Sequence, residues 1–292
     1  MISPKKVKFN NYSSVDFPTF TLLTCLSFDG TTGESNTFLT REAVASESFN
    51  GKFKNTSHYK YTENLTLKIT FIKEGYGDFS LDEARKVLAW LTSKDTPSFL
   101  DVYDDRYSEA ALYSVLGGFT NIQSYKLGSG RVVGFVADFE SISPFAYSPI
   151  NTFKRTITAP TTFKVTCNTD DTAYVYPRVT VKQKSGTDVI IKNTIITPEV
   201  DLLTGVTVNK TRVFTTAVRK NQVDETVVID GANKLIYSVT NPSRTFGKDF
   251  GTDDILDQWV WLPLANGENT ITVTGNCDLT LEWREVRKIG EW

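Results

Sequence analysis

Alternation of apolar and polar residues with a period of two is the feature of this sequence that most limits its fold. It recurs in LTLKITFIK (65–73), RVVGFVADF (131–139) and LTLEWREV (279–286). Successive side chains of a β-strand point to opposite faces, so each stretch is typical of a strand with one buried face. The residues expected to be buried are Leu65, Leu67, Ile69, Phe71, Val133, Phe135, Ala137, Phe139, Leu279, Leu281 and Trp283. The sequence therefore predicts a mainly β protein.

Dipeptides that tolerate positive φ angles lie between the alternating stretches. Such dipeptides favour tight turns, and turns between half-buried strands produce antiparallel hairpins. They are Asp29-Gly30, Asn50-Gly51, Asp230-Gly231 and Asn266-Gly267.

One segment departs from the period of two. In SLDEARKVLAWLTSK the apolar residues recur at helical spacing, which predicts a single amphipathic helix over about residues 80–93, covering a sheet. Ser80 and Glu83 fit a capping box, Asp82 favours the first turn, and Pro97 prevents continuation. The apolar stripe expected to face the sheet consists of Leu81, Ala84, Val87, Leu88 and Leu91.

The length of 292 residues favours two domains. The stretch SISPFAYSPINTFKRTITAP (141–160) holds three prolines among serines and threonines, and we interpret it as a connector. The predicted domains are residues 1–148 and 149–292. In the second domain the alternating stretches TFKVTC, YPRVTVKQ, DVIIK, ETVVID, LIYSV, NTITVTG and LTLEWRE indicate an antiparallel sandwich or jelly roll.

Charge and cysteine content argue against several classes of protein. Thirty-two Lys and Arg balance 34 Asp and Glu without a basic block, which argues against binding to nucleic acid or to an anionic membrane. No apolar run is as long as a membrane helix, and the N-terminus lacks a signal-peptide pattern, so we expect synthesis in the cytoplasm and no membrane insertion. Cys25, Cys167 and Cys277 are expected to be buried reduced thiols.

The residue patterns of catalytic and metal sites are missing. The single histidine, His58, has no cysteine or carboxylate nearby in the sequence, and the GSG at 128–130 is expected to be a hairpin turn. We interpret the pairs Asp104-Asp105, Asp170-Asp171 and Asp253-Asp254 as solvated loops. The group Asp249, Asp253, Asp254 and Asp257 lacks the spacing of an EF-hand calcium loop. We therefore expect no catalytic residue, no metal and no cofactor.

Two tryptophans are the weak candidates for ligand binding. Trp259 and Trp261, together with Trp283, have the chemistry of a sugar-stacking platform on a β-sandwich. In DQWVWLPL, however, Trp259 and Trp261 share one face of a strand, and an inward-facing aromatic pair is ordinary core packing. We favour the core interpretation and leave the ligand-binding one open.

The order of features resembles the distal tail proteins of long non-contractile phage tails, a family of virion structural proteins. In the first half, ESFNGKFKNTSHYKY resembles the stretch before that family's first long strand. FSLDEARKVLAWLTSKDTPSFLDVYDD resembles its helix and following strand, and GSGRVVGFVADFESISPFAYSP its closing strand. In the second half, DETVVIDGANKLIYS and WVWLPLANGENTITVTGNCDLTLEWREVRKIGEW resemble its C-terminal galectin-like or carbohydrate-module-like sandwich.

The resemblance implies a structural component of the phage tail tip, or baseplate hub, rather than an enzyme. It implies a β-sandwich-like N-terminal domain that forms a homohexameric ring between the tail tube protein and a tail-associated protein. The galectin-like domain would then either dock a receptor-binding protein or bind glycans, and the sequence leaves this choice open. The stretch LLTGVTVNKTRVFTTAVRKNQ (202–222) exceeds a minimal version of that domain and is either a peripheral insertion or an arm that holds a partner.

Two other functions remain open at this point. A carbohydrate-binding module for attachment to the host cell wall predicts a solvent-exposed aromatic platform. An enzyme on a jelly-roll scaffold predicts two carboxylates facing each other across a groove.

Overall fold

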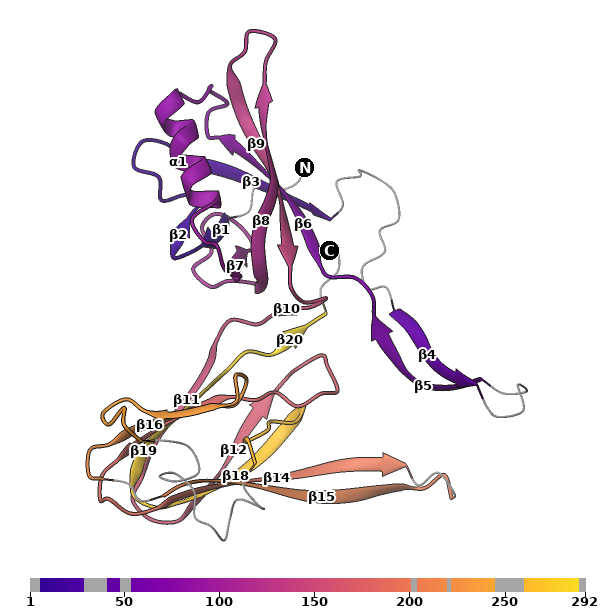
Figure 1. The fold of residues 1–292 in the computed structure, drawn as a ribbon, viewed down its shortest axis with the longest axis vertical. Helices are drawn as coiled ribbons and strands as arrows, with labels where there is room; N and C mark the ends of the chain where they lie inside the picture. Colours follow the sequence, from indigo (N-terminus) through magenta and orange to yellow (C-terminus); the bar gives the residue numbers. More distant parts are fainter. Residues whose placement is uncertain are drawn as a thin grey trace. The chain divides into compact units, whose positions relative to one another are not determined.

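The chain consists of two compact units. The computed structural model describes residues 6–28, 41–47, 54–200, 204–219, 222–244 and 260–288. Unit 1 contains residues 1–149 and 287–292, and unit 2 contains residues 150–286 (Figure 1). Both units are antiparallel β structures with their own cores, so the predicted mainly β fold is confirmed.

Unit 1 is built on one sheet, in which seven strands follow the order β2-β1-β7-β8-β9-β6-β3. Strands β10 and β20 also belong to this sheet, whereas β4 and β5 form a separate two-stranded ribbon. The strands are β1 Lys6–Phe9, β2 Tyr12–Ser13, β3 Leu22–Phe28, β4 Arg41–Glu47, β5 Lys54–Tyr61, β6 Thr66–Lys73, β7 Ser98–Tyr103, β8 Tyr113–Lys126, β9 Val132–Ser141, β10 Ala146–Tyr147 and β20 Val286–Arg287.

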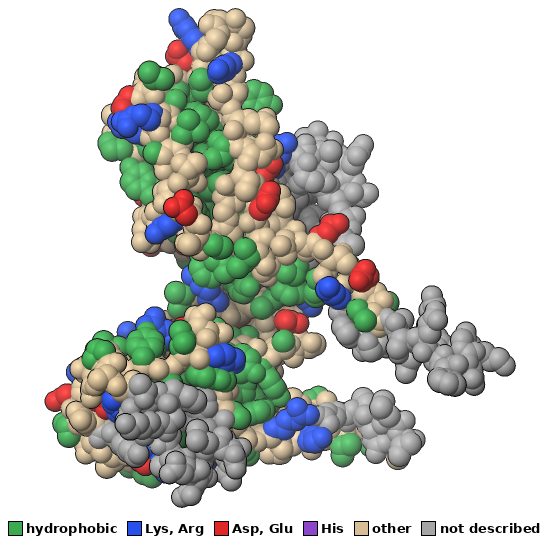
Figure 2. Space-filling model, viewed as in Figure 1, with side chains coloured by type: hydrophobic (Ala, Val, Ile, Leu, Met, Phe, Trp, Pro, Cys, Tyr) green, Lys and Arg blue, Asp and Glu red, His purple; other side chains and the backbone are tan. Residues whose placement is uncertain are grey.

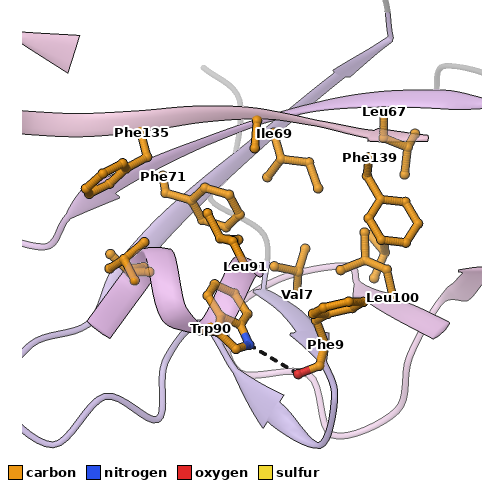
Figure 3. Packing of buried hydrophobic residues seen from close by; sticks show 14 of the residues in the cluster. Val7, Phe9, Leu67, Ile69, Phe71, Trp90, Leu91, Leu100, Phe135 and Phe139 are labelled. Atoms are coloured by element: carbon orange, nitrogen blue, oxygen red, sulfur yellow. Dashed lines mark hydrogen bonds between the residues drawn. The ribbon is translucent and has the colours of Figure 1, made fainter. Parts of the chain in front are cut away.

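The core of unit 1 lies between the two halves of this curled sheet. Val7, Phe9 and Leu100, from β1 and β7, lie across from Leu67 and other buried residues of β6 and β9 (Figure 3). The inward residues of β6 and β9 follow the predicted alternation from Leu67 to Phe71 and from Phe135 to Phe139 and are almost fully buried. The prediction is wrong for Val133, because the register of β8 and β9 shifts there, so that Val132 packs against the core and Val133 faces outward. The curl gives the domain the predicted sandwich-like character.

Helix α1 (Leu81–Leu91) closes this core, and its start agrees with the sequence. The Ser80 side chain accepts from the Glu83 N–H, and the Glu83 carboxylate accepts from the Ser80 N–H, completing the capping box. The helix ends at Leu91 with Thr92 as its C-cap, two residues before the predicted end near residue 93.

The predicted apolar stripe of α1 is wrong in part. Leu81 and Leu88 are 90% and 41% exposed, whereas Val87, Trp90 and Leu91 are buried. The Trp90 indole determines this orientation, because its Nε1 donates a hydrogen bond of 3.1 Å to the carbonyl oxygen of Phe9. A partner 81 residues away along the chain thus selects the face that enters the core.

Unit 2 is a sandwich of two antiparallel sheets, with orders β11-β19-β13-β16-β17 and β12-β18-β14-β15. The strands are β11 Asn151–Ile157, β12 Thr161–Cys167, β13 Arg178–Gln183, β14 Val189–Val200, β15 Thr207–Val218, β16 Thr226–Asp230, β17 Leu235–Ser238, β18 Gly267–Thr274 and β19 Cys277–Trp283. Every strand predicted in this half is present. Strands β10 and β11 occupy much of residues 141–160, so interpreting that whole stretch as a connector was wrong.

Two buried asparagines hold the chain entering β18. Asn193 donates to the Pro263 carbonyl oxygen at 2.7 Å and to the Asn269 side-chain oxygen at 3.0 Å. Asn269 also accepts from the Ala265 N–H and donates to the Ala265 carbonyl. Because buried backbone groups need partners, this network fixes the turn at Asn266-Gly267, where Gly267 has a φ of +92°.

The cysteines are free thiols, but not all are buried. Cys167 and Cys277 lie in the unit 2 core, where burial and the nearby Asp278 raise the pKa of Cys277 to about 11. Cys25 is only partly buried, because it lies on the face of the unit 1 sheet that points away from the core.

A buried ion pair joins two connections of unit 2. Arg244 contacts the Glu225 carboxylate, and their side chains are only 7% and 2% exposed. Arg244 also donates to the Arg219 carbonyl, and Glu225 accepts from the Gln222 N–H. Burial acts to raise the pKa of Glu225, but the bonds from Gln222 and Arg244 outweigh it and lower the pKa below 4.5.

Replacing Trp90 with Phe tests the anchor of α1. The change keeps an aromatic ring but removes the hydrogen bond to the Phe9 carbonyl and leaves a void where the larger indole packed, so we expect a loss of about 1–3 kcal/mol in the free energy of unfolding of unit 1. Denaturant unfolding followed by circular dichroism measures it. The matched control Leu88→Ala, on the exposed side of the helix, should change the free energy of unfolding by less than about 1 kcal/mol. If both variants lose the same amount of stability, Trp90 is not the anchor of α1.

Replacing Glu225 with Gln tests the ion pair. The change leaves Arg244 buried without a countercharge, so unit 2 should lose about 3–5 kcal/mol at neutral pH. Because the folded-state pKa of Glu225 is lowered, the stability due to its ionisation is fully present above pH 4.5 and is lost as the pH falls through the folded-state value. Unfolding curves between pH 7 and 3 should show this loss in the wild type and a smaller loss in the variant.

The exposed pair Lys164–Glu268 supplies the control for that experiment. Its side chains are 66% and 55% exposed, so Glu268→Gln should cost less than about 1 kcal/mol. If the free energy of unfolding falls equally with pH in the wild type and in Glu225→Gln, the buried pair does not cause the loss of stability in acid.

Candidate interaction surfaces

The residues singled out from the sequence for chemistry do not form a catalytic site within the described parts of the chain. His58 lies in β5, and its side chain is outside the described residues, as are Trp259 and the aspartates at 249–257. Asp105 organises its own loop by accepting from the N–H groups of Tyr107 and Ser108. Among the described residues, no three His, Cys, Asp or Glu side chains gather as metal ligands.

Trp261 packs against the unit 2 core and is only partly exposed. The Lys234 ammonium lies 5.5 Å from the centre of its ring and 3.4 Å from the centre of the Tyr176 ring. Desolvation lowers the pKa of Lys234. A cation over these rings occupies space that a stacked sugar needs, so this corner has the character of a cation–π cluster.

No membrane-crossing helix occurs in the part of the chain that the structure describes. The helix described, α1, has eleven residues, about half of what a bilayer requires.

An apolar hollow lies on the face of the unit 1 sheet that points away from the core. Thr70 and Ile72 alternate with the buried Ile69 and Phe71, so they face outward. They line a hollow of about 460 Å³ together with Tyr76, Tyr125, Leu127, Val133 and Gly134. Tyr76, Tyr125 and Leu127 are 79%, 61% and 55% exposed. We call this feature the outer hollow. Sequence periodicity missed it because Thr70 and Ile72 lie on the face of β6 expected to be polar, whereas Val133 was expected to be buried.

The exposed stripe of α1 is the second surface, which we call the α1 ridge. It consists of Leu81, Arg85 and Leu88, which lie on one side of the helix at i, i+4 and i+7. Figure 2 shows hydrophobic side chains among charged ones on the part of unit 1 that holds α1. Asp82, beside Leu81, forms ion pairs with Arg85 and Lys86, which lower its pKa.

Two ribbons extend beyond the sheets of their units (Figure 1). In unit 1, β4 and β5 pair with each other and join no larger sheet among the described strands. In unit 2, β14 pairs with β18 only from Ile190 to Thr194 but with β15 along its whole length. The first seven residues of β15, from Thr207, are exposed. We call the part of this strand pair that lies beyond the pairing with β18 the β14–β15 arm; it includes part of the additional stretch 202–222 noted in the sequence.

The β14–β15 arm exposes apolar side chains on both of its faces. Ile196 and Val213 are 61% and 58% exposed on one face, and Val208 is 55% exposed on the other. A two-stranded ribbon with such side chains in water is marginally stable by itself.

Comparisons with solved structures show that this fold is shared along nearly the whole chain. The Dit protein of phage SPP1, described as a paradigm of the hub adsorption apparatus in phages that infect Gram-positive bacteria, matches with a TM-score of 0.58 and 14% identity. The match covers 97% of this chain and 99% of that one. A chain of the phage P2 baseplate, in its activated conformation with Ca, matches with a TM-score of 0.52 and 11% identity, covering 99% and 100%.

The sequence itself matches two family models in the order expected along one protein. A phage tail protein N-terminal domain matches residues 5–143, and a phage tail C-terminal domain matches residues 145–283. No match was found among curated proteins. Because the two domain models together account for nearly the whole chain, the chain belongs to this family of phage tail proteins.

Proposed function

We propose that this chain is the distal tail protein, or baseplate hub, of a long-tailed non-contractile phage or prophage. In this role it joins the tail tube to the tail-tip and receptor-binding apparatus, as a virion structural protein and not as an enzyme. The observation that carries the proposal is the pair of phage tail domains in sequence, combined with a fold shared over 97% of the chain with a hub protein. Two other features of unit 1 and unit 2 support it.

The first supporting feature is the β4–β5 ribbon of unit 1. A two-stranded ribbon is marginally stable in water by itself, so packing against another surface stabilises it. A ring supplies one, because each copy contacts the next through two different surfaces. In the proposed role, the N-terminal domain (1–148) forms a homohexameric ring between the tail tube protein and the tail-associated protein.

The second supporting feature is the β14–β15 arm of unit 2. Its apolar side chains and its open strand edge along residues 207–213 suit pairing or packing with another protein. In the proposed role, the C-terminal domain (149–292) is a docking platform for a tail-tip or receptor-binding protein.

Antibody labelling of intact phage particles tests the position of the protein. A phage that encodes this chain is incubated with gold-labelled antibodies against the purified protein and viewed by electron microscopy. We expect label at the distal end of the tail. Label along the length of the tail, or none on particles that contain the protein by mass spectrometry, would contradict the hub role. Particles disrupted to expose internal proteins serve as the control for antibody access.

The mass of the purified chain tests the ring. Light scattering after size exclusion, over a range of protein concentrations, should detect a species of six chains that grows with concentration. Deleting residues 197–210 should leave the number of chains in this species unchanged, because these residues belong to unit 2. A chain that stays monomeric at every concentration would count against self-assembly.

A further inference from the structure

The β14–β15 arm has a strand edge on each side, and the two edges differ. In an antiparallel pair, the backbone N–H and C=O groups of every second residue point toward the partner strand. The backbone groups of the residues between them point away from it. Outward backbone groups form the template on which a sheet accepts another strand.

The Val260 backbone shows which groups of β15 point outward. Its N–H donates a hydrogen bond of 3.1 Å to the carbonyl oxygen of Thr215. Because β14 occupies one side of β15, this donor approaches from the other side. The two strands pair residue by residue from Val189–Val218 to Val200–Thr207, so the alternation extends back along β15 from Thr215. The outward backbone groups of the arm therefore belong to Thr207, Asn209, Thr211 and Val213.

The outer edge of β15 is suited to accept a strand. Residues Thr207 to Val213 are exposed, and no strand among the described residues pairs with this edge. The edge contains no proline, and threonine and valine are frequent in strands. The bond from Val260 shows that a backbone approaches the same edge closely at Thr215.

The edge on β14 is interrupted by a proline. The pairing of β14 with β18 ends at Thr194, and Pro198 follows in the arm. Pro198 lies opposite Asn209, whose backbone groups point outward, so the Pro198 nitrogen also lies on the side away from the partner strand. Proline has no N–H to donate and is typical of edges that do not pair. A partner strand is therefore expected on β15 and not on β14.

Charge argues against a second copy of this chain as the added strand. If two β15 edges paired antiparallel along residues 207–213, Lys210 would lie opposite the same lysine of the other copy. Lys210 and Arg212 are both exposed on one face of the arm. Like charges directly opposite each other destabilise a strand pair, whereas opposite charges stabilise it. This edge therefore fits a strand that carries acidic side chains on that face.

We propose that the outer edge of β15, from Thr207 to Val213, receives an extended strand of another tail protein, with acidic side chains near Lys210 and Arg212. This inference rests on the proposed function and names how the docking platform holds its partner. The outward backbone groups supply the hydrogen bonds, and the side chains of alternate residues select the strand.

Amide hydrogen exchange, read at single residues by mass spectrometry, compares the purified chain with tails isolated from phage particles. The N–H groups of Asn209 and Thr211 should exchange at least tenfold more slowly in tails. The N–H of Ile196, on the β14 edge of the same arm, is the matched control and should exchange equally fast in both. Equal rates for Asn209 and Thr211 in the two samples, or an equal slowing of Ile196, would overturn the proposal. If Asn209 slows in the purified chain as its concentration rises, the added strand comes from a second copy and the choice of partner is wrong.

Two proline variants test the edges against each other. Thr211 and Ile196 lie directly opposite each other, so Thr211→Pro and Ile196→Pro each remove one outward N–H and no bond between β14 and β15. Phages that carry Thr211→Pro should lose at least tenfold in infectious titre per particle, whereas Ile196→Pro should keep the wild-type titre. The purified variants should unfold at the same temperature as each other. Equal titres for the two variants would contradict pairing at β15.

Charge reversal tests the chemistry of the partner strand. Lys210→Glu combined with Arg212→Glu should also lower the titre at least tenfold. The matched control combines Lys154→Glu with Lys192→Glu, two exposed lysines outside the arm, and should keep the wild-type titre. If the two double variants have the same titre, the added strand is not acidic.

Failure of this contact can be distinguished from failure of the proposed function. If gold label marks the tail tip while Asn209 and Thr211 exchange as fast in tails as in the purified chain, the hub role stands and the pairing at β15 is wrong. If the label is absent from the tip of particles that contain the protein, both proposals are wrong.

Discussion

The contact between Phe9 and the centre of unit 1 is the interaction on which the first domain depends. The Phe9 ring lies edge-on to Phe119 at 5.1 Å and to Phe139 at 6.0 Å between ring centres, while its carbonyl accepts from Trp90 (Figure 3). These contacts tie the N-terminal strand, the long β8–β9 pair and the helix to one point. They hold β1 against the long strand pair and keep the Trp90 side of α1 toward the core.

Unit 2 is held together by aliphatic packing between its sheets and by buried polar pairs in its connections. Its two sheets meet through aliphatic side chains, and its polar connections are fixed by groups that are buried and paired, namely Asn193 with Asn269 and Glu225 with Arg244. Buried polar groups add little net stability, but they penalise alternative arrangements in which they lose partners. The core therefore supplies most of the stability, and the polar pairs define the conformations of the loops.

The surfaces of both units carry grouped apolar side chains, as expected for a protein that assembles with other chains. Exposed apolar side chains are grouped in the outer hollow, the α1 ridge and the β14–β15 arm, whereas the corner around Trp261 is occupied by Lys234. Grouped apolar side chains mark interaction sites more often than scattered ones do. A structural tail protein needs such surfaces, and the family to which the chain belongs agrees with that interpretation.

The sequence by itself determined many of the strands, though not β10 and β11, together with the capped start of α1 and the family, because alternation, capping residues and ordered motifs are local properties. It also located the extension at 202–222, but it did not predict that this stretch pairs with β14 in a two-stranded ribbon. Only the tertiary structure decided which stripe of α1 is buried and that Ile72, Tyr125 and Leu127 form a hollow. The reason is physical: periodicity shows that a face exists, but whether it meets the core, water or another chain depends on residues far away in the sequence, as Phe9 is from Trp90.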